Sequence, residues 1–166
     1  MSPLRRNSLF VRNTIFGIED SLAATVGLLS GLAAESISHE VLLLTGLVYI
    51  SVEAFSMGIG SFLSEESAQE YEGVPTTNLH TALGSFAMFA SCIGAGMVPL
   101  VPYFFLEDGQ ALFGSIALSL AVLAVLGVVQ ARLSGRSVLP RVLRMVLLGG
   151  AAIAVGVLVG KAFGLS

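Results

Sequence analysis

The segment 15–34, IFGIEDSLAATVGLLSGLAA, is an apolar run of membrane-spanning length that carries two adjacent carboxylates, Glu19 and Asp20. An ionised acid at bilayer depth costs about 2.5–3.5 kcal/mol on insertion scales, so such a residue normally faces a cavity or a partner. We therefore expect Asp20 to be a functional residue. A purely structural hydrogen bond to a neighbouring helix is the alternative.

The composition excludes an ordinary soluble protein, because 55% of the 166 residues are hydrophobic, 11% are charged, and the mean hydropathy is +0.90. Several segments reach the ~20 residues that a spanning helix needs. The prediction is an all-α polytopic membrane protein, with residues 1–166 forming one five-helix transmembrane domain. The expected spans are residues 14–34, 40–64, 78–101, 109–131 and 142–163.

The arginines predict the orientation of the chain. With five spans, both arginine clusters fall on one side of the membrane, and only Lys161 falls near the other side. Because positive residues favour the cytoplasmic side, we expect a cytoplasmic N-terminus. The clusters are Arg5, Arg6 and Arg12, and Arg132, Arg136, Arg141 and Arg144.

Met57 and Glu53 of the second span lie on a face of small and polar residues that recur at helical spacing. At ~1.5 Å per residue, Asp20 lies roughly 12 Å inside Arg12, and Met57 and Glu53 lie roughly 10 and 16 Å inside Ser64. Two carboxylates and a thioether at similar depth predict a site for a divalent transition metal, with Glu19 as a further candidate ligand. The thioether favours later transition metals over Mg²⁺ or Ca²⁺.

Two other patterns predict contacts at the ends and sides of the spans. Gly27 and Gly31 form a small-x-x-x-small pair on the Asp20 face, which lets helices approach closely and predicts part of a dimer interface. After the second span comes an acidic segment, which is either a solvated face or a weak metal-collecting surface. Its acids are Glu65, Glu66, Glu70 and Glu72.

Enzymatic chemistries do not fit the chain. His39-Glu40 is followed by Leu43 where a zinc metalloprotease requires a second histidine, and Cys92 is the single cysteine. An intramembrane aspartyl protease requires a second aspartate at the depth of Asp20, and Asp108 lies in a predicted loop. We expect neither an enzyme nor a bound cofactor, and no nucleic-acid partner.

Three motifs, taken in order along nearly the whole chain, resemble the vacuolar iron transporter family. They are Ile15-Phe-Gly-Ile-Glu-Asp-Ser-Leu with Gly27-Leu-Leu-Ser-Gly31, Ser56-Met-Gly-Ile-Gly60-Ser-Phe-Leu-Ser64, and Gly96-Met-Val-Pro99-Leu-Val-Pro-Tyr103. The resemblance implies a homodimer of five-helix subunits with a metal path between first and second helices. It places Asp20 and Met57 at the family's first-helix Asp and second-helix Met.

The chain departs from the family's pattern at two points and lacks one of its parts. It has Asp20-Ser21 where the family commonly has Asp-Gly, and Gly60-Ser61 where the family commonly has Gly-Glu. The helical metal-binding insert between helices two and three is reduced to the loop 65–77.

The function expected from the residues and the resemblance together is export of Fe²⁺, and of Mn²⁺ as a second cargo, from the cytoplasm by proton antiport. The expected location is the cytoplasmic membrane of a prokaryote, although an organellar membrane fits the same sequence. The alternatives are a non-transporting scaffold or assembly subunit of a membrane complex, and a transporter of this fold for another solute.

Overall fold

Five long helices account for nearly all of the described chain in the computed structural model, which describes residues 3–35, 37–73, 78–106 and 108–164. All five are long and apolar enough to cross a membrane, which confirms the predicted all-α fold and its five spans. The side on which the N-terminus lies stays a prediction. The elements are α1 (Pro3–Ala33), α2 (His39–Tyr71), α3 (Asn78–Leu100), the 3₁₀ helix η1 (Val101–Phe104), α4 (Asp108–Leu133) and α5 (Val138–Phe163).

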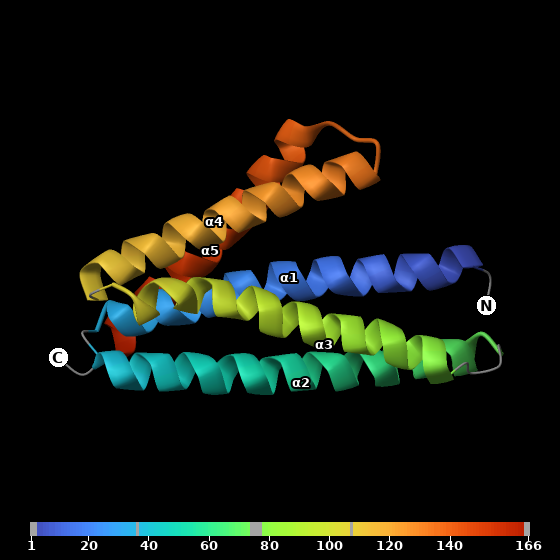
Figure 1. The fold of residues 1–166 in the computed structure, drawn as a ribbon, viewed down its shortest axis with the longest axis horizontal. Coiled ribbons are helices and arrows are strands. Elements are labelled where there is room, and N and C mark those ends of the chain that lie inside the picture. The colour runs from blue at the N-terminus through green and yellow to red at the C-terminus, as the bar shows by residue number, and fades with distance from the viewer. Residues whose placement is uncertain (1–2, 36, 74–77, 107, 165–166) are drawn as a thin grey trace.

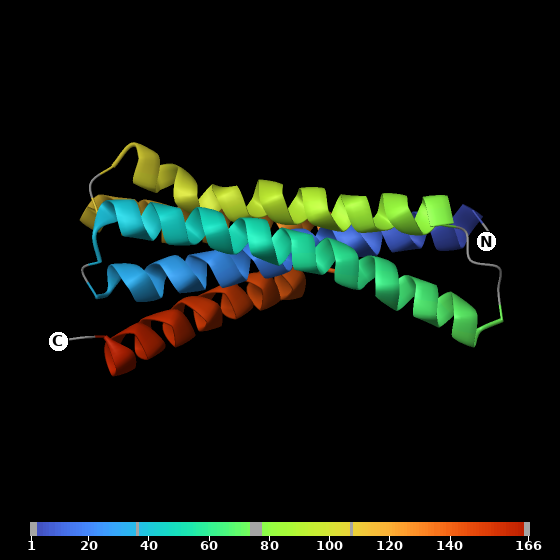
Figure 2. The same ribbon diagram turned by 90° about the horizontal axis from the view of Figure 1, so that it is seen from below.

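The helices form an elongated bundle in which α1 is central. It packs against α3, α5, α4 and α2, while α4 and α5 pair with each other. Figure 1 shows the start of α1, the end of α2, the start of α3 and the α4–α5 connection toward one end of the molecule, with the end of α5 at the other. Viewed from below, the C-terminal half of α1 is flanked by α2 on one side and α5 on the other (Figure 2).

The first two helices are longer than predicted at the end that carries the N-terminus. α2 continues to Tyr71 because buried polar side chains link the three helices that meet there. Arg12 of α1 lies 3.6 Å from the Glu65 carboxylate, and the Gln69 amide donates to Glu65 at 3.2 Å and to Thr81 of α3 at 3.0 Å. We call these four residues the Arg12–Thr81 network. It satisfies polar groups that would otherwise be buried without partners.

Glycines bring α1 and α5 into backbone contact. A Cβ on Gly27 would lie 2.8 Å from the Ala152 carbonyl oxygen, and one on Gly31 would lie 2.6 Å from that of Gly156. In return, side chains at 156 and 160 would collide with the carbonyl groups of Gly27 and Gly31. Two small-x-x-x-small pairs therefore interlock within the chain. The prediction that Gly27 and Gly31 form part of a dimer interface is wrong, because α5 covers them.

The prolines at the end of α3 end the helix as expected, but the aromatic residues after them are only partly exposed. Pro99 lies one residue before the last residue of the helix, and η1 follows with Pro102. The aromatic run after it suggests an interfacial anchor, but Tyr103 is 1% exposed and packs in the core with Leu29 and Leu100. Only its neighbours Phe104 and Phe105 are exposed, because η1 turns the chain back over the bundle.

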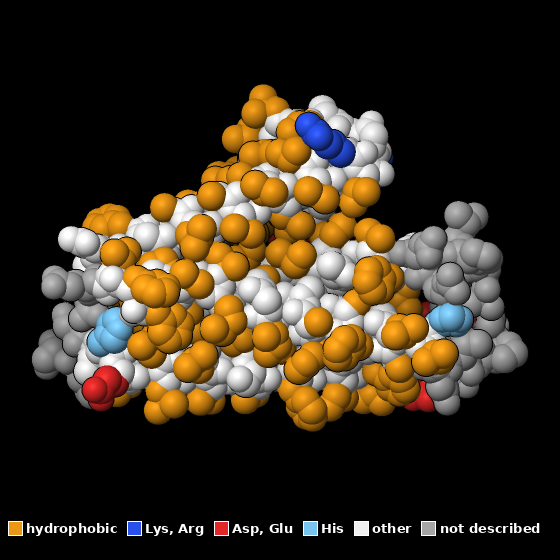
Figure 3. Space-filling model, viewed as in Figure 1, with side chains coloured by type: hydrophobic (Ala, Val, Ile, Leu, Met, Phe, Trp, Pro, Cys, Tyr) orange, Lys and Arg blue, Asp and Glu red, His pale blue; other side chains and the backbone are white. Residues whose placement is uncertain are grey.

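Much of the surface of the bundle is apolar. Figure 3 shows hydrophobic side chains over most of the face formed by the helices, with histidine and acidic side chains toward its two ends. Large exposed side chains such as Phe55 and Phe86 contribute to this surface. Such an arrangement is expected for helices whose solvent is lipid.

The glycine contacts predict opposite effects for two alanine substitutions in α5. Gly156→Ala should lower the melting temperature, since the new methyl group meets the Gly27 carbonyl and overpacking costs about 1–3 kcal/mol. Gly150→Ala should not, because a Cβ there meets open space and alanine is favoured over glycine in a helix by about 1 kcal/mol. Unfolding can be followed in detergent with a thiol-reactive dye, since Cys92 is buried. Equal melting temperatures would contradict the close α1–α5 packing.

A second prediction concerns the Arg12–Thr81 network. Glu65→Ala should lower the melting temperature in the same assay, because it leaves the buried Gln69 amide with one partner fewer and removes the ion pair with Arg12. Glu70→Ala is the matched control, since Glu70 is exposed one turn further along α2. If the two variants melt alike, Glu65 does not hold the three helices together.

Candidate functional site

One strip of α1 remains open between its neighbours. Arg12 and Phe16 are exposed, and Glu19, Asp20 and Ala23 are half-buried, so the side of α1 that follows this line of residues is incompletely covered. We call these five residues the open strip. A pocket lies on each side of it, one toward α2 and one toward α4 and α5. Other described parts of α1 are exposed as well, among them Phe10 and Val11, but they carry no acid.

The pocket toward α2 has a volume of about 520 Å³. Phe16 of the open strip, Met57 of α2 and Met88 of α3 all line it. Asp20 follows Asn13 and Phe16 at helical spacing, which places it on the same side of α1, one turn deeper than the pocket. Asp20 itself does not line this pocket, so its predicted convergence with Met57 stays a prediction. The remaining lining residues are Arg12, Asn13, Ser56, Gly60, Ser61 and Ser64.

The Glu53 carboxylate lies at the junction of α1, α2 and α3, and both of its oxygens accept hydrogen bonds. Tyr49, one turn earlier on α2, donates to Oε1 at 2.6 Å. Ser21 of α1 lies 3.0 Å from Oε2 and 2.9 Å from the carbonyl oxygen of Cys92 on α3. Glu53 thus links α2 to α1 through Ser21, and Ser21 in turn contacts α3.

Asp20 differs from Glu53 in its surroundings. Among the described residues, no side chain donates a hydrogen bond to Asp20 or pairs with it. Its charge and that of Glu53 both act on the Tyr49 hydroxyl and on the Cys92 thiol, so the two carboxylates share one neighbourhood. Asp20 is thus the carboxylate whose oxygens are available to a ligand.

Glu19 points away from that neighbourhood. It lines the pocket of about 410 Å³ toward α4 and α5, together with Gln130 and Arg141. Arg141 donates to Gln130 at 3.1 Å, which ties the start of α5 to the end of α4. In the described parts of the chain, no three His, Cys, Asp or Glu side chains are close enough to hold a metal ion together. Glu19 therefore does not join Asp20 and Glu53 in one ligand group within this chain.

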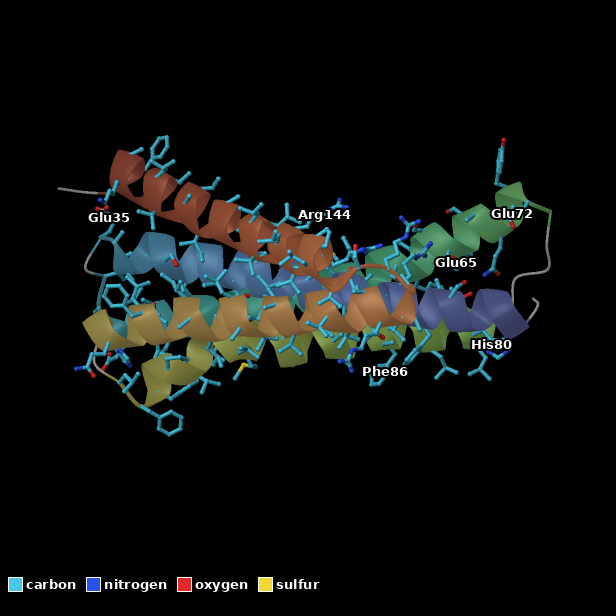
Figure 4. The ribbon with its side chains drawn as sticks, turned by 90° about the horizontal axis from the view of Figure 1, so that it is seen from above. Glu35, Glu65, Glu72, His80, Phe86 and Arg144 are labelled. Atoms are coloured by element: carbon cyan, nitrogen blue, oxygen red, sulfur yellow. The ribbon has the colours of Figure 1, made fainter. Side chains whose placement is uncertain are left out.

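The acidic segment after the second span does not act as one surface. Glu65 is buried in the Arg12–Thr81 network, so its prediction as a metal-collecting residue is wrong. Glu66 is half-buried, and Glu70 and Glu72 are exposed. Figure 4 shows Glu65 and Glu72 on α2 near the end where His80 of α3 lies, with Glu35 at the opposite end. Only the last three acids stay candidates for loading metal.

Three residues of this region make contacts that the sequence analysis did not predict. Tyr49 shares the Glu53 face at a spacing of four residues, and that spacing was the available signal for the hydrogen bond. Ser21 appears in the sequence only as a departure from the family pattern. Met88 is 6% exposed and packs near Met57, a contact between α2 and α3 that no local pattern reveals.

Comparisons with known proteins agree with this architecture. Vacuolar iron transporter 1 of Tulipa gesneriana is 22% identical over 213 aligned residues, which cover 92% of this chain and 86% of the relative. Vacuolar iron transporter 1 of Arabidopsis thaliana is 31% identical over 61 residues, which cover 37% of this chain and 24% of the relative.

The sequence profile of the VIT family matches residues 11–83 and 73–161. The two matched segments meet at the connection between α2 and α3. Together they span all five helices and both walls of the pocket that contains Met57. The chain therefore belongs to the VIT family.

Proposed function

We propose that this protein exports Fe²⁺, with Mn²⁺ as a second cargo, from the cytoplasm in exchange for protons. Its family is one of transporters rather than enzymes, and the relatives named above are iron transporters, so the general class is a metal-ion transporter in a membrane. The direction of transport, the choice of ion and the coupling to protons are the proposal. The arginines at one end of the bundle support the cytoplasmic placement of that end.

One observation carries the proposal: Asp20 is a half-buried carboxylate of a membrane-spanning helix with no described partner, beside a pocket that a thioether lines. An intramembrane acid without a partner is typical of an ion pathway. The Met57 thioether favours a later transition metal over Mg²⁺ or Ca²⁺. Asp20 and Met57 are the proposed metal ligands. A site for an ion that binds only oxygen would not need the methionine.

The open strip of α1 leads us to propose a homodimer. Glu19 and Asp20 lie side by side on a face that one copy leaves incompletely covered, and exposure of charged groups to lipid is costly. In a dimer with a two-fold axis, the open strip of each copy would pack against the open strip of the other, because such interfaces are self-complementary. It would also bring a second Asp20 toward the first and supply the ligands that one copy lacks.

The proposed coupling is a competition at carboxylates. A metal ion binds the deprotonated form, so it must displace a proton, and a proton arriving from the other side releases the metal. The cytoplasmic acids Glu66, Glu70 and Glu72 would raise the local concentration of cations at the entrance. They would thereby affect loading rather than passage.

The dimer predicts a specific cross-link. Phe16→Cys should form an intermolecular disulfide in the membrane under mild oxidation, because Phe16 is 49% exposed on the open strip. Phe113→Cys should not, although Phe113 on α4 is 75% exposed, since it does not belong to the open strip. The native Cys92 is buried and contributes no background. Cross-linking at Phe113 but not at Phe16 would place the contact between copies on another face.

The transport mechanism predicts the effects of two neutral substitutions in proteoliposomes. Asp20→Asn keeps the shape but removes the titratable charge, so Fe²⁺-driven proton movement should fall to the level of empty vesicles. Met57→Leu keeps the volume and removes the sulfur, so it should impair Fe²⁺ more than the harder Mn²⁺. Glu40→Gln, at an exposed position at the start of α2, and Met97→Leu are the controls and should keep normal flux.

The same experiment separates the alternatives. Wild-type flux in Asp20→Asn would contradict the proton exchange. Absence of metal flux in the wild-type protein, with a normal cross-link at Phe16, would favour a scaffold. Proton-coupled flux of a solute other than a divalent metal would favour a different cargo for the same fold.

A further inference from the structure

The second pocket beside the open strip lies between α1 and the connected ends of α4 and α5, and it has no part in the proposed metal path. Its volume is about 410 Å³. Figure 1 shows α4 diverging from α1 toward its connection with α5, and the pocket lies where the two helices separate. Its polar lining comes from three helices and the turn after α4, and consists of Arg12, Glu19, Gln130, Ser134 and Arg141.

The side-chain amide of Gln130 has a defined orientation in this pocket. Arg141 donates a hydrogen bond to Gln130 Oε1 at 3.1 Å, and a guanidinium can only donate, so the atom that faces it must be the amide oxygen. The amide nitrogen is therefore free to donate elsewhere, and no described residue accepts a hydrogen bond from it. Gln130 is 6% exposed, and a buried amide without an acceptor is costly.

The two arginines of the pocket also have donors without partners. Each guanidinium carries five N–H groups. Arg141 is half-buried and pairs with no acid in the described parts of the chain. Arg12 is 3.6 Å from Glu65, its one ion pair with a described acid, and its side chain is 68% exposed. Since a half-buried cation needs a counter-charge, the pocket calls for an anion.

The lining fits one chemical class of ligand. Both guanidinium groups, the Gln130 amide nitrogen and the Ser134 hydroxyl can donate, so the ligand must offer several acceptor oxygens. Arginine forks match the oxygens of a phosphate in geometry and charge. With Glu19 as the one acid in the lining, two guanidinium groups leave a formal charge of +1. That charge complements the single negative charge of a phosphodiester.

The apolar part of the lining indicates where such a phosphodiester comes from. Arg141 directly precedes the expected span 142–163, which places the pocket near the boundary between lipid headgroups and acyl chains. Basic pockets between membrane helices bind the headgroups of anionic lipids. A free phosphate ion gains nothing from hydrophobic neighbours, whereas acyl chains can lie against them. The hydrophobic residues that line the pocket are Val11, Ile15, Phe16 and Leu133.

We propose that this pocket binds the headgroup of an anionic phospholipid, whose phosphodiester is held by Arg12, Arg141 and Gln130. The acyl chains would lie beside the apolar residues of α1 and α4, so the lipid would bridge the two helices where they diverge. Neither Asp20 nor Met57 lines the pocket, which makes the lipid site separate from the proposed metal ligands.

The test measures lipid binding without transport. Phosphatidylglycerol added to the purified protein in a neutral detergent should raise the melting temperature in the thiol-dye assay, because a ligand of the folded state stabilises it. Phosphatidylcholine at the same mole fraction should not, since its own cation cancels the charge of its phosphate. Inorganic phosphate at the same concentration should not either, because it lacks the acyl chains.

Two variants remove the positive charge of the pocket. Arg141→Gln should raise the phosphatidylglycerol fraction needed for the half-maximal shift about tenfold, the order expected for loss of a charged hydrogen bond. Ser134→Asp should act in the same direction by bringing the formal charge of the lining to zero. Its site is exposed, so it replaces Arg141→Gln if that variant does not fold.

Arg144→Gln is the matched control. Figure 4 shows Arg144 near the start of α5, and this exposed arginine does not line the pocket. Its loss should change the half-maximal fraction less than about twofold, because exposed charges contribute little. Equal losses in Arg141→Gln and Arg144→Gln would overturn the site in favour of a general attraction to anionic lipid. A shift with inorganic phosphate alone would overturn the lipid as occupant, and no shift with phosphatidylglycerol in the wild-type protein would overturn both.

Discussion

A carboxylate inside a membrane needs hydrogen-bond donors, a cation or a protein surface to cover it, and this requirement shapes the first helix. Glu53 of α2 is stabilised by donors from two helices. Asp20 and Glu19 are not satisfied in that way, and they lie on a strip of α1 that the rest of the chain leaves incompletely covered. The remaining four helices all pack against other parts of α1.

The separate faces of α1 explain how one helix can serve two purposes. Its C-terminal half approaches α5 through glycines, which fixes the bundle by backbone contact. Its middle third carries the acids and lies beside a pocket with two methionines. The close packing and the proposed metal site therefore lie on different turns of the helix, and a change in one can leave the other intact.

The number, order and approximate bounds of the helices could be predicted from hydrophobic length alone, because each span must satisfy its own backbone in lipid. The ends were less predictable. α2 extends to Tyr71 only because Glu65 and Gln69 find partners on α1 and α3, and those contacts depend on the tertiary structure. For the same reason Glu65 resembles an exposed acid in the sequence but is buried.

The site could be predicted in its chemistry but not in its connections. Asp20, Glu53 and Met57 could be identified as unusual residues at similar depth. The hydrogen bond from Ser21 to Glu53 joins residues 32 positions apart and depends on the crossing of two helices, which no local pattern specifies. The direction of Glu19 could not be predicted either, since adjacent residues on a helix differ by about 100° and either acid could have faced α2.

The use of glycines within the chain has a consequence for what can pack against α1. Helices that meet through glycine backbones approach closely, whereas full-sized side chains keep helix axes about 8–10 Å apart. Because Gly27 and Gly31 are already covered by α5, the strip that α1 leaves open carries side chains as large as Phe16. Whatever packs against that strip is therefore held at the ordinary spacing of two helices and meets side chains rather than backbone.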